Sequence, residues 1–162
     1  MIFKFSQLKN IIYFCSLLNI LLSIKTINGE ILHHQKQIQK PAICNYKNEC
    51  ILLEIAKKKD EMRKGLMFRE ELDHDKGMLF DYGSPKYVNI WMLNTFIPLD
   101  IIFINNGTIV KIVEEAKPCL NLPCELYNSV YPVDKVLEIN AGKSKKMQLK
   151  KGDRLYLKYL KY

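Results

Sequence analysis

The middle of the sequence contains a group of residues whose side chains could recognise a small polar molecule. The group consists of Arg69, Trp91, Asn94, Thr95 and Asp100. An indole ring can stack on a ligand, amide and hydroxyl groups can hydrogen-bond it, and a guanidinium can clamp a carboxylate or another anion. We therefore interpret this group as a candidate ligand-binding pocket, with Trp91 as its stacking wall and Arg69 as its anion clamp.

The same residues also have a purely structural interpretation. Asp100 begins an otherwise apolar strand, and a carboxylate in such a place needs a partner. Arg69 could supply an ion pair, while Asp100 and Asn94 fix the turn through hydrogen bonds to the main chain and Trp91 packs in the core. This interpretation carries more weight, because polar residues of this kind more often stabilise a fold than bind a substrate.

A third interpretation is a small hydrolase or isomerase that uses Asp100 with Asn94 and Arg69. The sequence has no G-x-S-x-G, no H-E-x-x-H and no phosphate-binding glycine loop, so no known catalytic motif supports it. A solvent-reachable, unpaired Asp100 would favour a binding site, and a raised pKa of that carboxyl would favour an enzyme. Burial of Asp100 against main-chain amides would instead favour a structural or partner-binding protein.

The N-terminus predicts export. Lys4 and Lys9 precede an almost wholly apolar stretch, residues 11–24. This stretch has the length of the apolar part of a secretory signal and is short for a bilayer span. We expect a signal peptide over residues 1–29, with an uncleaved membrane anchor as the alternative, and therefore a periplasmic or extracellular protein.

The rest of the chain is interpreted as a leader and one domain. Residues 30–50 are polar, lack periodicity and contain Pro41, which is typical of a flexible leader. Residues 51–162 then have enough apolar sequence for a single domain with a core of its own.

The remaining cysteines predict disulfides. Once Cys15 of the signal segment is set aside, four are left: Cys44, Cys50, Cys119 and Cys124. An even number in an exported chain favours disulfides, but four cysteines allow three pairings. We expect Cys44 with Cys50 and Cys119 with Cys124, because each pair brackets a short loop with turn residues. Redox or metal chemistry is the alternative, but neither pair has the C-x-x-C spacing, so no metal or other cofactor is expected.

The charge of the chain limits its partners. The formal net charge is +8, and much of it lies in lysine runs at residues 57–59 and 143–151. No aromatic residues are interleaved with these runs, so a nucleic-acid partner is not expected. We expect a monomeric binding module of the cell envelope for a small polar molecule or a polysaccharide. It would contact a membrane only through an uncleaved signal.

Hydrophobic patterning predicts a mainly β (α+β) fold. Asn105-Asn106-Gly107 tolerates the positive φ angles of a tight hairpin, and residues 116–132 read as a long loop. The helical connections that a parallel βαβ fold needs are missing, so we expect a small antiparallel β-barrel-like domain of about seven strands. The expected strands are 51–56, 77–82, 87–93, 99–104, 108–114, 133–139 and 153–160, with short helices at 60–67 and 143–149.

An ordered set of short motifs carries a family resemblance. The motifs are Gly65-Leu66-Met67-Phe68-Arg69, Gly77-Met78-Leu79-Phe80, Trp91-Met92-Leu93-Asn94-Thr95, Ile97-Pro98-Leu99-Asp100 and Gly152-Asp153-Arg154. In this order they resemble the family known as domain of unknown function 192, over about Leu52 to Leu157. The resemblance implies a compact, β-rich, commonly exported domain with no established enzymatic activity.

Two positions depart from the family pattern. Lys58-Lys59 stands where relatives often have Thr-Pro, which weakens the start of the expected helix. Leu93 stands where a basic residue often follows the Trp-Met pair. If that base contacts a ligand in relatives, this protein lacks the contact.

Overall fold

The computed structural model describes residues 38–161, and residues 39–161 belong to one compact unit. The expected signal peptide, residues 1–29, and the first part of the expected leader lie outside the described residues.

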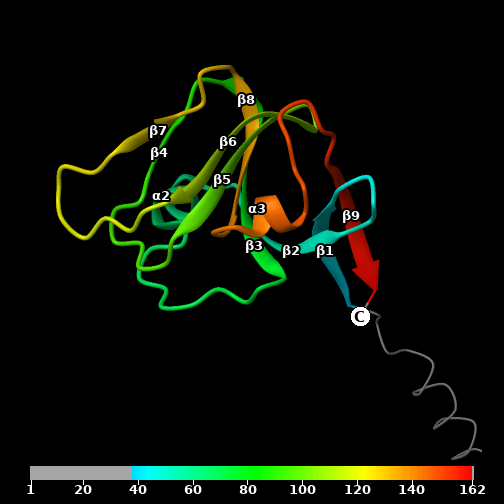
Figure 1. Cartoon of the computed structure of the whole chain (residues 1–162), viewed down its shortest axis with the longest axis horizontal. Helices are drawn as coiled ribbons and strands as arrows, with labels where there is room; N and C mark the ends of the chain where they lie inside the picture. Colours follow the sequence, from blue (N-terminus) through cyan, green and yellow to red (C-terminus); the bar gives the residue numbers. More distant parts are fainter. Residues whose placement is uncertain (1–37, 162) are drawn as a thin grey trace, which may run out of the picture. The chain divides into compact units, whose positions relative to one another are not determined.

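Seven strands form one mixed sheet in the spatial order β6-β5-β8-β3-β2-β1-β9 (Figure 1). These strands are β1 (Gln39–Cys44), β2 (Cys50–Ala56), β3 (Lys76–Lys86), β5 (Leu99–Asn105), β6 (Thr108–Ala116), β8 (Val133–Asn140) and β9 (Tyr156–Lys161). A second sheet pairs β4 (Asn89–Trp91) with β7 (Leu126–Asn128). The two helices in the described part of the chain are short: α2 (Lys59–Lys64) and α3 (Lys143–Lys146).

The predicted fold class is confirmed, and the structure corrects its details. The domain is mainly β with two short helices, but it has nine strands among residues 38–161 and an open sheet with β6 and β9 at its edges. All neighbours in the large sheet are antiparallel except β2 and β3, which are parallel. A parallel pair requires a crossover, and the connection that contains α2 supplies it. The crossover was not recognised because α2 is so short.

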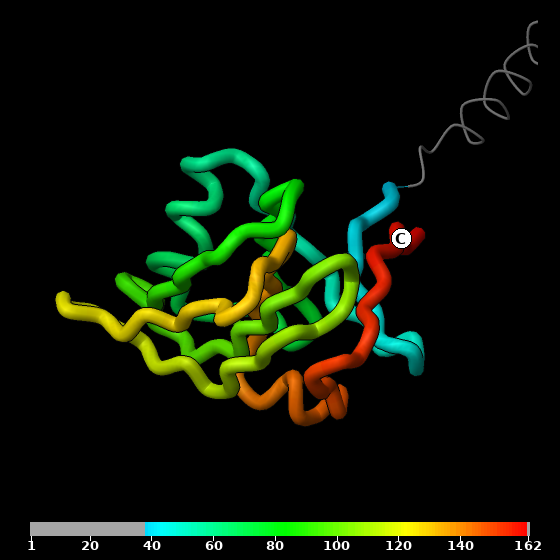
Figure 2. Tube along the Cα trace, turned by 90° about the horizontal axis from the view of Figure 1, so that it is seen from above, coloured from blue at the N-terminus to red at the C-terminus, as the bar shows by residue number. Residues whose placement is uncertain are grey.

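The sheet begins earlier than the sequence analysis placed the domain. Gln39–Cys44 were expected to belong to a flexible leader over residues 30–50, but they form β1 between β2 and β9. Figure 2 shows β9, in red, beside β1. The presence of Pro41 was one reason for predicting a leader. In the structure Pro41 pairs with Tyr159 of β9 and lies outside the register that β1 shares with β2. Its missing N–H therefore removes no hydrogen bond from the β1–β2 pair.

Each face of the sheet carries its own apolar cluster. In the central strand β8, Val136 belongs to one cluster, whereas Leu137 and Ile139 belong to the other. This is the alternation expected of a strand that is covered on both faces. Residues of α2 and β4 cover the Val136 face, and Met147 and Leu149, which follow α3, cover the Leu137 face.

Two glycine-containing segments fix the register. The predicted hairpin is confirmed: Asn105 pairs with Thr108, and Asn106 and Gly107 have φ angles of 47° and 77°. Gly77 of β3 pairs with Ile139 of the neighbouring strand β8. A Cβ atom there would be 2.7 Å from the carbonyl oxygen of Glu138, so no larger residue fits without moving the strands.

Candidate functional site

Asp100 is a buried structural residue. It is 0% exposed, and its carboxylate accepts four hydrogen bonds. Oδ1 accepts from the main-chain N–H groups of Glu115 (2.9 Å) and Gly142 (3.1 Å). Oδ2 accepts from the N–H (2.9 Å) and the hydroxyl (2.6 Å) of Ser144. Four donors compensate for the loss of water around the carboxylate, so no free acceptor faces solvent.

Two irregularities of the main chain place these donors around Asp100. Leu99 pairs with Ala116 and Ile101 with Val113, so one extra residue of β6 forms a bulge opposite Asp100. Glu115 in this bulge has a φ of 53°, and its N–H has lost its strand partner and turns to Asp100. The other donors lie at the start of α3: the N–H of Gly142, which precedes the helix, and the N–H and hydroxyl of Ser144 in its first turn. Asp100 therefore caps this helix from a distant strand.

Arg69 does not pair with Asp100, contrary to the ion pair considered from the sequence. Its guanidinium instead donates two hydrogen bonds of 2.6 Å to the two carboxylate oxygens of Glu54. This bidentate bond raises the pKa of Arg69 and lowers that of Glu54. Because both side chains are partly exposed, the pair is worth about 1 kcal/mol or less.

Asn94 and Thr95 organise the loop that follows β4. Asn94 has a φ of 54°, a left-handed conformation that asparagine tolerates better than most residues. Its N–H donates to the Cys119 carbonyl (2.8 Å), and its own carbonyl accepts from the Phe68 N–H (2.7 Å). Thr95 donates its N–H to the Met92 carbonyl at 3.0 Å. Asn94 therefore ties the segment after α2 to the loop that contains the second disulfide.

A cavity of about 290 Å³ lies beneath α2, and we call it the α2 pocket. Its apolar wall consists of Met62, Leu66, Met67, Phe80 and Ile90, and its aromatic and polar lining of Tyr82, Asn89, Trp91, Thr95 and Glu138. Arg63, Lys64 and Gly65 of α2 and its C-terminal turn complete the lining. Trp91 is 43% exposed, whereas its neighbour Met92 is 1% exposed. These two neighbouring side chains therefore lie on opposite faces of the chain, as successive residues of an extended strand do.

Glu138 is the acidic group of the α2 pocket. It stands opposite Met78 of β3 and Ile101 of β5, on the same face of the sheet as Val136. It is 5% exposed, and no described residue donates a hydrogen bond to its carboxyl. Burial alone raises its pKa to about 8. A carboxyl in this position is a strong candidate for contact with a ligand.

Tyr82 is the second titratable group inside the pocket. Burial, with a smaller contribution from the negative charge of Glu138, raises its pKa to about 12. The phenol therefore stays protonated at physiological pH and can donate a hydrogen bond. Its ring already forms a cation–π contact with Lys86, whose Nζ lies 4.3 Å from the ring centroid.

The structure brings some of the predicted site residues together and separates others. Trp91 and Thr95 both line the α2 pocket. Asn94 lies in a shallower neighbouring groove beside Trp91 and Leu93, and Arg69 and Asp100 line neither. Whether any of these residues binds a ligand stays a prediction.

The sequence analysis missed Glu138. The signal was present, because Glu138 interrupts the apolar run 136–139 just as Asp100 interrupts the run 99–104. Asp100 received attention because it followed a recognisable Pro-Leu-Asp motif.

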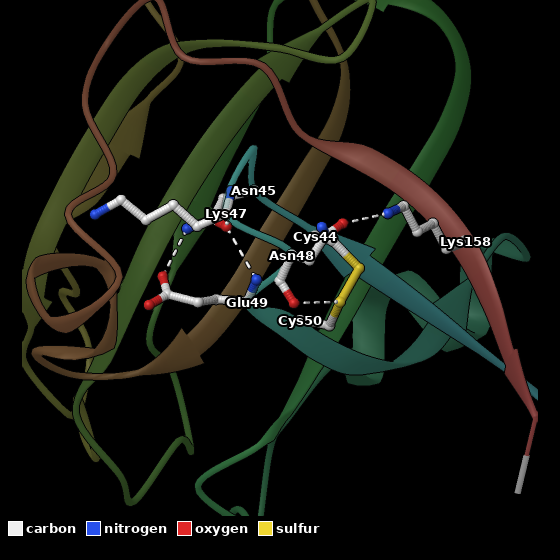
Figure 3. Close-up of a disulfide and its surroundings, with 7 residues drawn as sticks. All are labelled: Cys44, Asn45, Lys47, Asn48, Glu49, Cys50 and Lys158. Atoms are coloured by element: carbon white, nitrogen blue, oxygen red, sulfur yellow. Dashed lines mark hydrogen bonds between the residues drawn. A yellow bond between two sulfur atoms is a disulfide. The ribbon is translucent and has the colours of Figure 1, made fainter.

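Both expected disulfides are present. Cys44 is bonded to Cys50, and Cys119 to Cys124. Cys44 and Cys50 face each other at the end of the β1–β2 pair (Figure 3). Inside the loop they close, the Asn45 side-chain oxygen accepts from two main-chain N–H groups, those of Lys47 (2.9 Å) and Glu49 (3.0 Å). Two disulfides are typical of a protein in an oxidising environment.

The described residues contain neither a metal-site pattern nor a membrane span. Within residues 38–161, no three His, Cys, Asp or Glu side chains come together in a way that could hold a metal ion. No helix in this part of the chain is long and apolar enough to cross a bilayer.

The fold and motifs define a class of mainly β domains with an open mixed sheet, and the family follows from a match over residues 42–157. The chain belongs to the family of domain of unknown function 192 (DUF192, "Uncharacterized ACR"). This confirms the resemblance noted in the sequence. No curated protein matches the chain.

Two solved structures are similar to the chain. A Sinorhizobium meliloti protein, provisionally assigned as a transcription regulator, is 36% identical with a TM-score of 0.66; the match covers 74% of this chain and 92% of that one. A Novosphingobium aromaticivorans protein of unknown function is 33% identical with a TM-score of 0.65, over 72% and 83% of the two chains. Neither comparison names a ligand.

Proposed function

We propose that this domain is a binding module that holds one small polar molecule in the α2 pocket. The observation that carries the proposal is Glu138, a buried carboxyl that lines the cavity and has no partner among the described residues. A buried polar group without a partner destabilises a fold. A ligand that satisfies it gains the corresponding stabilisation on binding.

The size of the cavity favours a small ligand. At about 290 Å³ it is at the lower end of the range for small-molecule sites. It can hold a metabolite or one terminal unit of a polysaccharide, but not an extended polymer. The candidate ligand contacts are Trp91, Thr95 and Glu138. Asp100, which the sequence analysis included, stabilises the bulge and α3 and is not part of this proposal.

We place this activity outside the cytoplasm. Support comes from the signal-like residues 1–29, from the two disulfides and from family members that are commonly exported. The binding module would act in the cell envelope as a monomer, with membrane contact only through an uncleaved signal. We do not propose a nucleic-acid partner, since the lysine runs lack interleaved aromatic residues.

The second candidate is an enzyme, and a specific observation favours it. A raised acid pKa that would indicate acid–base chemistry occurs at Glu138, with a value of about 8. A carboxyl that titrates near neutral pH can transfer a proton to or from a bound substrate. This would be a hydrolase or isomerase that uses Glu138 in place of Asp100.

Thermal unfolding of the purified protein with a panel of sugars, wall fragments, amino acids, amines and carboxylates tests the proposal. We expect one compound class to raise the unfolding temperature saturably in the wild type and in Glu70→Gln, a control at an exposed carboxylate. The same class should have no effect on Glu138→Gln. Equal stabilisation of Glu138→Gln, or no stabilisation by any compound, would contradict the proposal.

A further inference from the structure

We propose that the α2 pocket selects a small zwitterion, with its ammonium group against Glu138 and its carboxylate or phosphate toward Arg63 and Lys64. This inference rests on the proposed binding function and specifies the chemistry of the ligand. Three features of the pocket support it. They are an acidic floor (Glu138), an aromatic wall (Phe80, Tyr82 and Trp91) and a basic mouth (Arg63 and Lys64).

The acidic floor is Glu138 alone. The charged and titratable groups that line the pocket with it are Tyr82 of β3 and Arg63 and Lys64 of α2. Lys86, on the far end of β3, is engaged with the Tyr82 ring. No cation of the described chain pairs with Glu138, so its carboxyl is open to a cationic group from outside. An ammonium group on a ligand provides both the charge and the hydrogen-bond donors that a buried carboxylate requires.

The aromatic wall favours a cation at the same end. Phe80, Tyr82 and Trp91 all line the cavity that contains Glu138. Aromatic rings attract cations through their quadrupole, and cages of such rings recognise ammonium and quaternary ammonium groups. Because the Tyr82 ring already forms a cation–π contact with Lys86, Phe80 and Trp91 are the rings that remain for contact with a ligand.

The basic mouth favours an anionic group at the other end of the ligand. Arg63 and Lys64 are exposed on α2 and line the same cavity. Within residues 38–161 neither forms an ion pair. The acidic residues of this helix do not line the α2 pocket. Asp60 and Glu61 line a neighbouring outer groove that Arg63 and Lys64 also border, and Glu61 contacts Lys58. A simple amine would be repelled by the two cations at the entrance, whereas a zwitterion satisfies both ends.

Isothermal titration with matched probes tests this inference. One set is glycine betaine, choline, and the carbon isostere of glycine betaine in which a tert-butyl group replaces trimethylammonium. The second set is γ-aminobutyrate, butylamine and butyrate. We expect the zwitterion of at least one set to bind about tenfold more tightly than the cation and the anion of that set. If both zwitterions bind no better than their single-charge analogues, the inference is wrong.

Three variants assign the two ends of the ligand. Glu138→Gln should weaken zwitterion binding by about tenfold or more. The double substitution Arg63→Gln, Lys64→Gln removes the repulsion at the entrance, so it should strengthen choline or butylamine binding and remove the advantage of the zwitterion. Glu70→Gln should behave as the wild type. Retained zwitterion preference in the double variant would overturn the assignment of the basic mouth.

Proton release gives a second readout that a structural role would not change. Because the pKa of Glu138 is about 8 in the free protein, binding of an ammonium group at pH 7 should release close to one proton. Titrations in buffers with different ionisation enthalpies measure this release, because the observed binding enthalpy then changes with the ionisation enthalpy of the buffer. Glu138-dependent binding of a neutral or anionic compound without proton release would overturn the zwitterion inference and leave the binding function standing. No Glu138-dependent binding of any compound would remove both.

Discussion

Asp100 and Glu138 are two buried carboxyls on neighbouring strands, and they differ in how many hydrogen bonds the described residues donate to them. In the β5–β8 register, Asp100 stands opposite Ile139 and Glu138 opposite Ile101. They are therefore one position apart, on opposite faces of the sheet. Asp100 accepts four hydrogen bonds, whereas Glu138 lines a cavity and receives none from the described residues.

Burial alone therefore does not reveal the role of an acidic residue. The role of a buried carboxyl depends on whether the protein places hydrogen-bond donors around it. On the Asp100 face, a bulge and a helix start leave main-chain N–H groups without regular partners, and the carboxylate satisfies them. On the Glu138 face the neighbours are apolar or aromatic side chains, so the carboxyl is left for a ligand. The comparison can be tested by changing each carboxyl and its partners.

Removal of the Asp100 carboxylate should have the largest effect. Asp100→Ala leaves three N–H groups and the Ser144 hydroxyl buried without acceptors, so we expect a loss of about 3–5 kcal/mol in the free energy of unfolding. Urea unfolding monitored by circular dichroism measures it. Asp153→Asn is the matched control, because Asp153 caps an exposed turn at the N–H of Lys150 and should cost about 1 kcal/mol or less. A cost for Asp100→Ala as small as that of the control would contradict the structural role.

Replacement of Glu138 should change the pH dependence of stability. Its pKa is about 8 in the fold against 4.5 as the reference value, so the native state holds the proton more tightly than the unfolded state. The stabilising contribution is complete below pH 4.5 and is lost as the pH rises toward 8, by at most about 1.4 kcal/mol per pH unit.

Glu138→Gln cannot lose a proton, so the difference in stability between the variant and the wild type should shift in favour of the variant between pH 5 and pH 8. Urea titrations at several pH values check this. A difference that does not change with pH would mean that the carboxyl is hydrated or paired in solution.

Loss of a single Asp100 donor should cost less. Ser144→Ala removes the 2.6 Å hydroxyl bond but keeps the N–H of residue 144, so we expect a loss of about 1–2 kcal/mol. In the Asp100→Ala background the same change should cost much less, because the hydroxyl has already lost its acceptor. Additive effects in this double-mutant cycle would show that the bond does not form.

The surface pair should show the smallest effect. Arg69→Gln removes both bonds to Glu54, and because both side chains are partly exposed we expect a loss of about 1 kcal/mol or less. The pKa of Glu54, which this pair lowers, should rise toward its ordinary value in the variant. Carboxyl chemical shifts followed by NMR through an acid titration measure it. A loss comparable to that of Asp100→Ala would mean that the pair contributes much more than its exposure indicates.

Short-range features of the fold were predictable from the sequence. The Asn-Gly hairpin, the central strands and the local pairing of the cysteines depend on backbone preferences and on loops of a few residues. β1 was missed because its polar start and Pro41 resemble a leader, and its first three residues pair only with the distant strand β9. The parallel arrangement of β2 and β3 was missed because only a very short helix marks the crossover.

For the candidate site, the amino-acid pattern alone is enough to show that the carboxyls of Asp100 and Glu138 interrupt apolar strands and that Trp91 and Met92 face opposite ways in an extended strand. These facts follow from hydropathy and from the two-residue period of a strand. Three features could be known only from the tertiary structure. Asp100 accepts hydrogen bonds from the start of α3, Arg69 pairs with Glu54, and Glu138 lines a cavity. The physical reason is range: those partners lie far apart in the sequence, and sheet register and the packing of α2 and α3 bring them together.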